Sequence, residues 1–329
     1  MRLAVRIALL AGLAVVVALI AREGASSVLA PISRAGWILL LLVPLHLLPL
    51  VLDVLGWSTL LMRRARLRTL MWIAAIREAV DRLLPVANIG GELVGIRLLA
   101  AHGVEGTVAA ASVVVEVLLT LIAQYVFVAL GVVFLLKLSG AVARTGDVLV
   151  GLGVTLPVIA LLGALLRYGS VFQRLGRMAE WMLGANHQAL SFLGSSANLD
   201  ATIRELYGHR LRLVAAMACE LLGMIVGSAE TWLALRWLGH PVGIAGSVVL
   251  ESLTLAARTF GFLVPAGLGV QEAGLVGVGY LLGVGGDLAI ALSLAKRMRE
   301  IVFGVPALLL WYWTEGRRER ARVRDLEGS

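Results

Sequence analysis

The chain has 329 residues, of which 60% are hydrophobic and only 15% are charged, and its mean hydropathy is +0.92. About half of the residues of a soluble domain are apolar and about a quarter are charged, so this composition excludes an ordinary soluble protein and indicates a bilayer as solvent. The net charge of +8 comes mainly from arginines in short segments beside apolar runs, a pattern that follows membrane topology and argues against a nucleic-acid partner. The single cysteine, Cys219, excludes an intramolecular disulfide and a paired-cysteine metal or redox site.

Six apolar runs are long enough to cross a bilayer, since about 20 helical residues span its hydrocarbon core. In chain order they are Leu3–Ala21, Trp37–Met62, Thr107–Leu136, Val148–Leu166, Leu211–Trp237 and Leu288–Trp313. The first run resembles a secretory signal, but Pro31 directly follows the candidate cleavage site, so we expect a retained helix. The sequence therefore predicts an all-α, polytopic membrane protein.

Arginine is unevenly distributed among the segments between these runs. It is abundant in segments 63–68 and 167–212 and after Trp313, and sparse in segments 22–36, 137–147 and 239–243. Cytoplasmic loops carry the excess of Lys and Arg, so the first three segments are expected inside the cell and the last three outside. Both termini then lie in the cytoplasm of a multi-pass protein of the bacterial inner membrane, provided that two further segments enter the membrane and return on the same side.

These two further segments, 70–101 and 244–283, share a pattern. Each is interrupted by a proline and by glycines, and a glutamate follows seven residues after the proline, as in Pro85 with Glu92 and Pro265 with Glu272. Proline ends a helix because it lacks a backbone donor, and glycine lets the chain turn back. Such non-helical backbone survives at membrane depth only beside protein or a water-filled cavity.

Two interpretations of the breaks remain open, namely two kinked spanning helices or two re-entrant hairpins that enter from opposite sides. The second is typical of two inverted repeats, whose broken helices meet near the midplane and form a substrate site. On this interpretation the whole chain is one transmembrane domain. Its parts are an N-terminal helix and loop (1–36), a first repeat (37–166), an amphipathic cytoplasmic connector (167–210), a second repeat (211–313) and a basic tail (314–329).

Ionisable residues are frequent within these runs and around the breaks, although a charge at mid-bilayer costs roughly 2.5–3.5 kcal/mol. Examples inside spanning runs are Asp53, Glu116, Glu220 and Glu230. Three pairs have i,i+4 spacing, which puts both partners on one helix face: Arg77 with Asp81, Glu78 with Arg82, and Lys296 with Glu300. Structural ion pairs are therefore one explanation of the charges. A polar, partly hydrated cavity is the other, and it accounts better for the whole set because buried ion pairs seldom stabilise more than apolar side chains do.

Several motifs carry a resemblance to a known family. They are Leu84-Pro85-Val86-Ala87-Asn88-Ile89-Gly90-Gly91-Glu92 and Val264-Pro265-Ala266-Gly267-Leu268-Gly269-Val270-Gln271-Glu272, together with Arg77-Glu78-Ala79-Val80 and Lys296-Arg297-Met298-Arg299-Glu300. Over nearly its whole length the chain resembles the flippase-like transmembrane domain of bacterial lysylphosphatidylglycerol synthases, and it looks most like the branch associated with hopanoid biosynthesis. The resemblance implies a lipid-handling domain without aminoacyl transfer, since nothing after Trp313 could encode the transferase domain. Asp81-Arg82 departs from the two uncharged polar residues expected in that branch, which puts the lipid in doubt.

The resemblance and the charges together predict a lipid flippase or lipid-transport protein, and not an enzyme, that acts on a hopanoid or an anionic phospholipid. The candidate substrate-binding residues are Arg82, Asn88, Glu92, Arg258, Glu272, Lys296, Arg297, Arg299 and Glu300. The basic side chains would attract a phosphate, and the glutamates would orient them or accept hydrogen bonds from a polyol or an amine. The half-helix N-termini after the two prolines would add positive dipole ends aimed at an anion. We expect no metal and no cofactor.

Two alternatives stay open. One is a membrane-embedded enzyme that modifies a lipid through paired carboxylates, although the sequence contains no recognisable nucleophile–base set. The other is a non-catalytic accessory protein of hopanoid biosynthesis. An assay of the reconstituted protein with a labelled lipid separates the three functions: a transporter moves the lipid between leaflets, an enzyme consumes it and an accessory protein does neither. The expected partners are a membrane lipid, further copies of the chain and enzymes of the hopanoid pathway.

Overall fold

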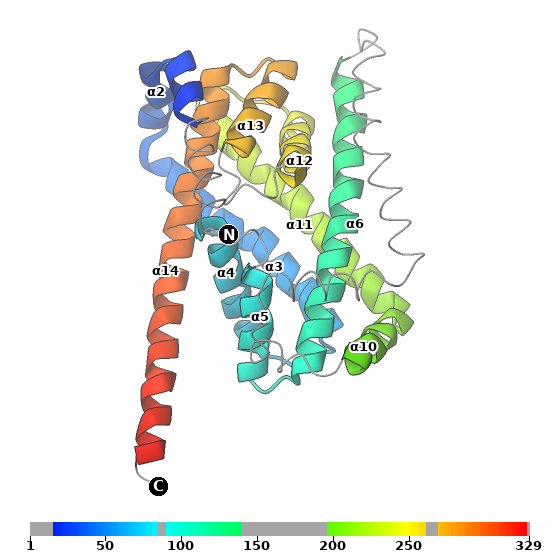
Figure 1. Cartoon of the computed structure of the whole chain (residues 1–329). Helices are drawn as coiled ribbons and strands as arrows, with labels where there is room; N and C mark the ends of the chain where they lie inside the picture. Colours follow the sequence, from blue (N-terminus) through cyan, green and yellow to red (C-terminus); the bar gives the residue numbers. More distant parts are fainter. Residues whose placement is uncertain (1–15, 85–89, 140–195, 261–268, 328–329) are drawn as a thin grey trace.

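The computed structural model describes residues 16–84, 90–139, 196–260 and 269–327. Within these residues the regular elements are helices and no strand occurs, so the predicted all-α architecture is confirmed. In chain order the elements are α2 (Ala25–Ala35), the 3-10 helix η1 (Gly36–Leu41), α3 (Leu42–Leu60), α4 (Leu67–Leu83), α5 (Gly90–Ala101), α6 (Gly106–Ser139), α10 (Ser196–Gly208), α11 (Arg210–Trp237), α12 (Ile244–Phe260), α13 (Val270–Leu281) and α14 (Gly286–Glu327) (Figure 1).

Three stretches of the described chain are long and apolar enough to cross a membrane, namely 25–60, 106–138 and 210–237. They contain α3, α6 and α11, which correspond to three of the predicted spanning runs. The run predicted at 288–313 forms part of α14, a helix of 42 residues that also carries the charged residues 296–300. The run predicted at 148–166 lies outside the described residues, as does most of the first run. A multi-pass membrane protein follows from the three apolar stretches.

Each predicted break separates a helix of 17 residues from one of 12 residues that folds back against it. In the first pair the Gly91 N–H donates to the Asp81 carboxylate at 2.8 Å, and Gly95 lies against the Arg77 side chain. In the second pair Gly274 of α13 lies against Ala257 of α12. The contacts run antiparallel, so α4–α5 and α12–α13 are helical hairpins and not single kinked helices. The side from which each hairpin enters the membrane stays a prediction.

The two hairpins occupy matching places in the sequence and opposite ends of the molecule. The short helices begin at Gly90 and Val270, and the long helices that follow begin at Gly106 and Gly286, so both spacings are 180 residues. Figure 1 shows that α5 joins α6 at the lower end, whereas α13 joins α14 at the upper end, so α6 and α14 run in opposite directions. This arrangement favours the inverted repeat, which itself stays a prediction.

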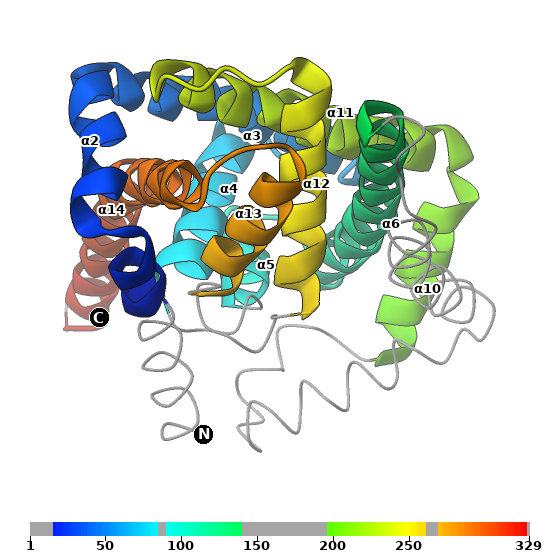
Figure 2. The same cartoon turned by 90° about the horizontal axis from the view of Figure 1, so that it is seen from above.

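Apolar side chains hold the helices together in several buried clusters. One cluster, which includes Trp57, Leu70 and Leu99, joins α3, α4, α5 and α6. A second, which includes Leu39, Leu235 and Leu292, joins η1, α11 and α14 with parts of α2, α12 and α13. In Figure 2 the long helices α3 and α11 lie side by side along the upper edge, and α12 packs beside α6. The described part of the predicted connector contains α10, whose two buried side chains pack against α6.

The topology can be tested at the end of the first hairpin, where Ala101 is exposed. In a Cys219→Ala background we expect Ala101→Cys and the exposed Arg64→Cys to resist an impermeant maleimide added to intact cells and to react after permeabilisation. Pro241→Cys, which is exposed and predicted outside, should react in intact cells and serves as the control. If the impermeant reagent labels Ala101→Cys while Arg64→Cys is protected, then α4 and α5 together cross the membrane and the hairpin is not re-entrant.

Candidate functional site

A cavity of about 610 Å³ lies among eight helices, α3 to α6 and α11 to α14. Charged side chains dominate the polar part of its wall. The acidic ones are Asp53, Glu78, Asp81, Glu92, Glu116, Glu220, Glu230, Glu251 and Glu300, and the basic ones are Arg77, Arg82, Arg258, Lys296 and Arg299. The cavity explains why otherwise apolar helices contain ionisable residues. It also carries more acids than bases.

Arg77 of α4 is one centre of this polar interior. Its Nη1 donates to both oxygens of Glu116 on α6, at 2.9 and 3.0 Å, and its Nη2 donates to Glu92 on α5 at 2.5 Å. The guanidinium also lies over the ring of Trp57 on α3, 4.6 Å from the ring centre. Arg77 is only 8% exposed. A fork-shaped guanidinium suits two carboxylates, and here it ties four helices together.

His46 of α3 is a second centre. Its Nε2 lies 2.8 Å from Glu78 of α4, and its Nδ1 lies 2.8 Å from Glu230 of α11. Arg299 of α14 donates to the other oxygen of Glu230 at 2.7 Å and also contacts the imidazole. His46 is therefore a hydrogen-bonded helix residue, and it links α3, α4, α11 and α14.

The remaining ion pairs join different helices or lie within α14. Lys296 pairs with Glu251 of α12, and Glu300 lies 3.7 Å from Arg82 of α4 and 3.2 Å from Arg297. The predicted i,i+4 pairs within α4 and within 296–300 do not occur among the ion pairs of the described residues, so that expectation was wrong. An ion pair within one helix stabilises that helix by only about 0.2–0.5 kcal/mol. Side chains that point into one shared interior therefore pair with partners on facing helices instead.

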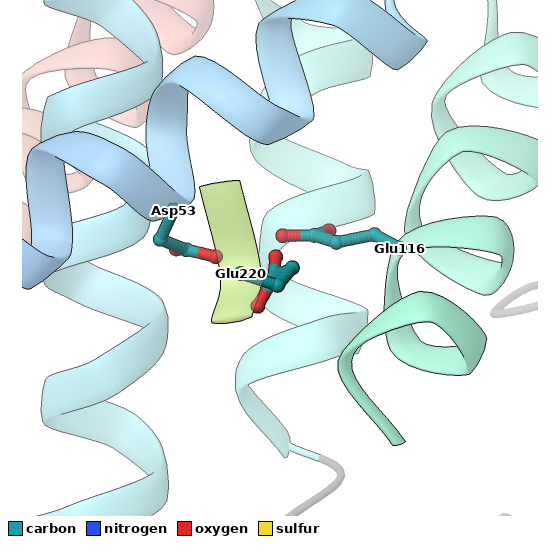
Figure 3. A group of neighbouring side chains, drawn as sticks. All are labelled: Asp53, Glu116 and Glu220. Atoms are coloured by element: carbon teal, nitrogen blue, oxygen red, sulfur yellow. The ribbon is translucent and has the colours of Figure 1, made fainter. Parts of the chain in front are cut away.

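Four charged side chains of the wall have no ion pair among the described residues: Asp53, Asp81, Glu220 and Arg258. Asp81 is satisfied by the Gly91 N–H, as described above. Asp53 of α3 and Glu220 of α11 point toward Glu116, and the three carboxylates each place an oxygen within 4.8 Å of the others (Figure 3). Oxygens at this spacing suit a hard cation, although an acidic cluster alone does not identify a ligand.

The cavity collects six of the nine residues predicted from sequence to bind substrate. They are Arg82, Glu92, Arg258, Lys296, Arg299 and Glu300. Asn88 lies outside the described residues.

Glu272 and Arg297 are not among the lining residues. Glu272 is 2% exposed and accepts hydrogen bonds from the Gly269 N–H at 2.8 Å and from the Ser293 hydroxyl at 2.9 Å, with the Arg297 Nε at 3.4 Å. It thereby caps the N-terminus of its own helix, α13. Of the two glutamates expected to meet in one cavity, Glu92 lines it and Glu272 does not.

Nine further ionisable residues of the wall were not predicted as site residues. They are His46, Asp53, Arg77, Glu78, Asp81, Glu116, Glu220, Glu230 and Glu251. The signal that could have found them is the high cost of a charge in an apolar run, which marks such residues as functional candidates by default.

The family model described as the lysylphosphatidylglycerol synthase TM region matches residues 3–307, a range that includes every residue of the cavity wall. Neither a curated protein nor a solved structure gave a significant match. The match does not show whether the chain belongs to the branch associated with hopanoid biosynthesis, so that assignment stays a prediction. The chain belongs to the family of the lysylphosphatidylglycerol synthase transmembrane region, and this membership indicates a role connected with membrane lipid.

Proposed function

We propose that this protein translocates a lipid and holds its phosphate-bearing headgroup in the cavity while the acyl tails remain in the bilayer. The protein would act in the bacterial inner membrane as a transporter and not as an enzyme, with both termini in the cytoplasm. Family membership supports a lipid as the ligand. The headgroup assignment rests on Arg258, which lines the cavity without an ion pair to a described carboxylate.

Arg258 lines the cavity and forms no ion pair with any described carboxylate. The other four basic side chains of the wall each have one, through Glu116, Glu300, Glu251 and Glu230. A charge removed from water is costly unless it is paired, so Arg258 is the side chain that a bound anion would compensate. Phosphate is the anion that a lipid headgroup supplies, and guanidinium binds it with geometric specificity. An anionic phospholipid fits this requirement directly, and a hopanoid fits it if its headgroup carries a phosphate.

Arg258→Gln tests the proposal in liposomes that contain the reconstituted protein and a headgroup-labelled phospholipid. We expect translocation to slow at least about tenfold, because a charged hydrogen bond contributes about 1.5–3 kcal/mol. Arg236→Gln is the matched control, since Arg236 is exposed at the end of α11 and does not line the cavity. Wild-type rates in both variants would contradict the proposal, and a change in the mass of the lipid would favour the enzyme instead.

A further inference from the structure

Two side chains on the α12–α13 side of the cavity have a polar atom that the described chain does not satisfy. Thr254 is 6% exposed and Gln271 is 3% exposed, and both line the cavity. The Oγ1 of Thr254 and the Oε1 of Gln271 have no hydrogen-bond partner among the described residues. Thr254 precedes Arg258 by four residues on α12, so the two share a helix face. Buried polar groups are nearly always hydrogen-bonded, so unsatisfied ones in a cavity wall point to a ligand.

The neighbours of Gln271 show what this ligand must offer. The Ser293 hydroxyl gives its single proton to Glu272 at 2.9 Å, so its oxygen can only accept from the Gln271 amide nitrogen, 3.4 Å away. The amide nitrogen therefore faces Ser293, and Oε1 is left as an acceptor without a donor. An anion alone would not satisfy it. A hydrogen-bond donor would.

The rest of the cavity wall offers both acceptors and donors. Asp53 and Glu220 belong to the wall and have no cationic partner within the described part of the chain. Carboxylate oxygens accept hydrogen bonds. Besides Arg258, donors are also left for a ligand, because the Nε of Arg77, the Nη1 of Arg82 and the Nε of Arg299 have no hydrogen-bond partner among the described residues. A ligand that satisfies the wall must therefore carry acceptors, as a phosphate does, and at least one donor for the Oε1 of Gln271.

We propose that the cavity selects a phosphodiester headgroup whose distal group donates hydrogen bonds, either through the hydroxyls of a glycerol or through the ammonium of an ethanolamine. This inference rests on the proposed function, since it concerns the headgroup of the translocated lipid. The phosphate lies against Arg258 and the Thr254 hydroxyl. The distal donors face the Oε1 of Gln271.

Two matched lipid pairs test the selection. Phosphatidylglycerol and phosphatidylethanol have the same charge and differ in the hydroxyls, whereas phosphatidylethanolamine and phosphatidylcholine are both zwitterionic and differ in the N–H donors. N,N-dimethyl phosphatidylethanolamine keeps one N–H and controls for headgroup size. Lipid binding to the purified protein is measured by native mass spectrometry. We expect the donor-bearing member of at least one pair to bind about 3- to 10-fold more tightly, and the pair that shows this identifies the donor.

Gln271→Leu then assigns the preference to this part of the wall. The variant should reduce the preference toward equality while phosphatidylethanol binds as it does to wild type, which also shows that the variant is folded. Thr314→Val is the control, because Thr314 is exposed on α14 and remote from the wall. Equal affinities within both pairs for the wild-type protein would overturn the headgroup inference while leaving translocation intact. A protein that binds and moves none of the five lipids would instead overturn the proposed function.

Discussion

Replacing Arg77 with methionine is expected to lower the free energy of unfolding by about 3–5 kcal/mol, the cost of breaking a buried ion pair from one side. Arg77 is 8% exposed and donates to Glu116 and Glu92 from the neighbouring helices. Methionine retains the apolar stem, so the loss reports the charge and not the packing. Glu116, which is 3% exposed, would be left as a buried carboxylate without a cation.

The double variant Arg77→Met with Glu116→Met separates this effect from a general loss of structure. Because two apolar side chains often replace a buried ion pair without penalty, we expect the double variant to regain most of the lost stability. Unfolding in detergent micelles, followed by circular dichroism against denaturant, gives the free energies. A double variant as unstable as Arg77→Met would show that Arg77 acts through Glu92 or Trp57 and not through Glu116.

Replacing Gly91 with alanine is expected to destabilise the first hairpin by about 2–3 kcal/mol, through overpacking and a lost hydrogen bond. A Cβ at this position would lie 2.3 Å from an Asp81 carboxylate oxygen and 2.5 Å from the Arg77 carbonyl oxygen. The carboxylate can turn away, although the Gly91 N–H then loses its acceptor. The carbonyl belongs to the backbone of α4, so α5 must move away from α4 instead.

Gly277→Ala provides the matched comparison on α13, because a Cβ there would meet no atom within 4 Å. Alanine is favoured over glycine inside a helix, so this variant should gain up to about 1 kcal/mol. Thermal unfolding of both purified variants under the same conditions measures the contrast. Equal changes in the two midpoints would mean that α4 and α5 are not held at the close distance described above.

Much of the architecture could be predicted from residue types and their spacing. The helices and the interruptions near Pro85 and Pro265 follow from proline, glycine and apolar runs, which act locally, and the family follows from the resemblance of the quoted motifs. The partners of the charges could not be predicted in this way. Arg77 was expected to face Asp81 on its own helix, but it binds Glu116 and Glu92, because those partners depend on how separate helices pack.

The acidic cluster illustrates the same limit. Asp53, Glu116 and Glu220 come from three helices far apart in the sequence, and no spacing rule relates them. Glu272 shows the converse. Its position seven residues after a proline matches that of Glu92, yet a local interaction with Gly269 holds it at the start of α13. Equal spacing in sequence therefore did not guarantee equal surroundings.

The position of His46 restricts how the protein can move. A hydrogen bond between nitrogen and oxygen is effective over only about half an ångström, from roughly 2.7 to 3.2 Å. The imidazole of α3 reaches Glu78 of α4 and Glu230 of α11 at 2.8 Å, and Arg299 of α14 closes the ring of contacts. Sliding any one of these four helices past the others by a fraction of a helical turn would break at least one of the contacts. Mechanically, α3, α4, α11 and α14 form a rigid frame, and a gate that opens between any two of them must first release this histidine.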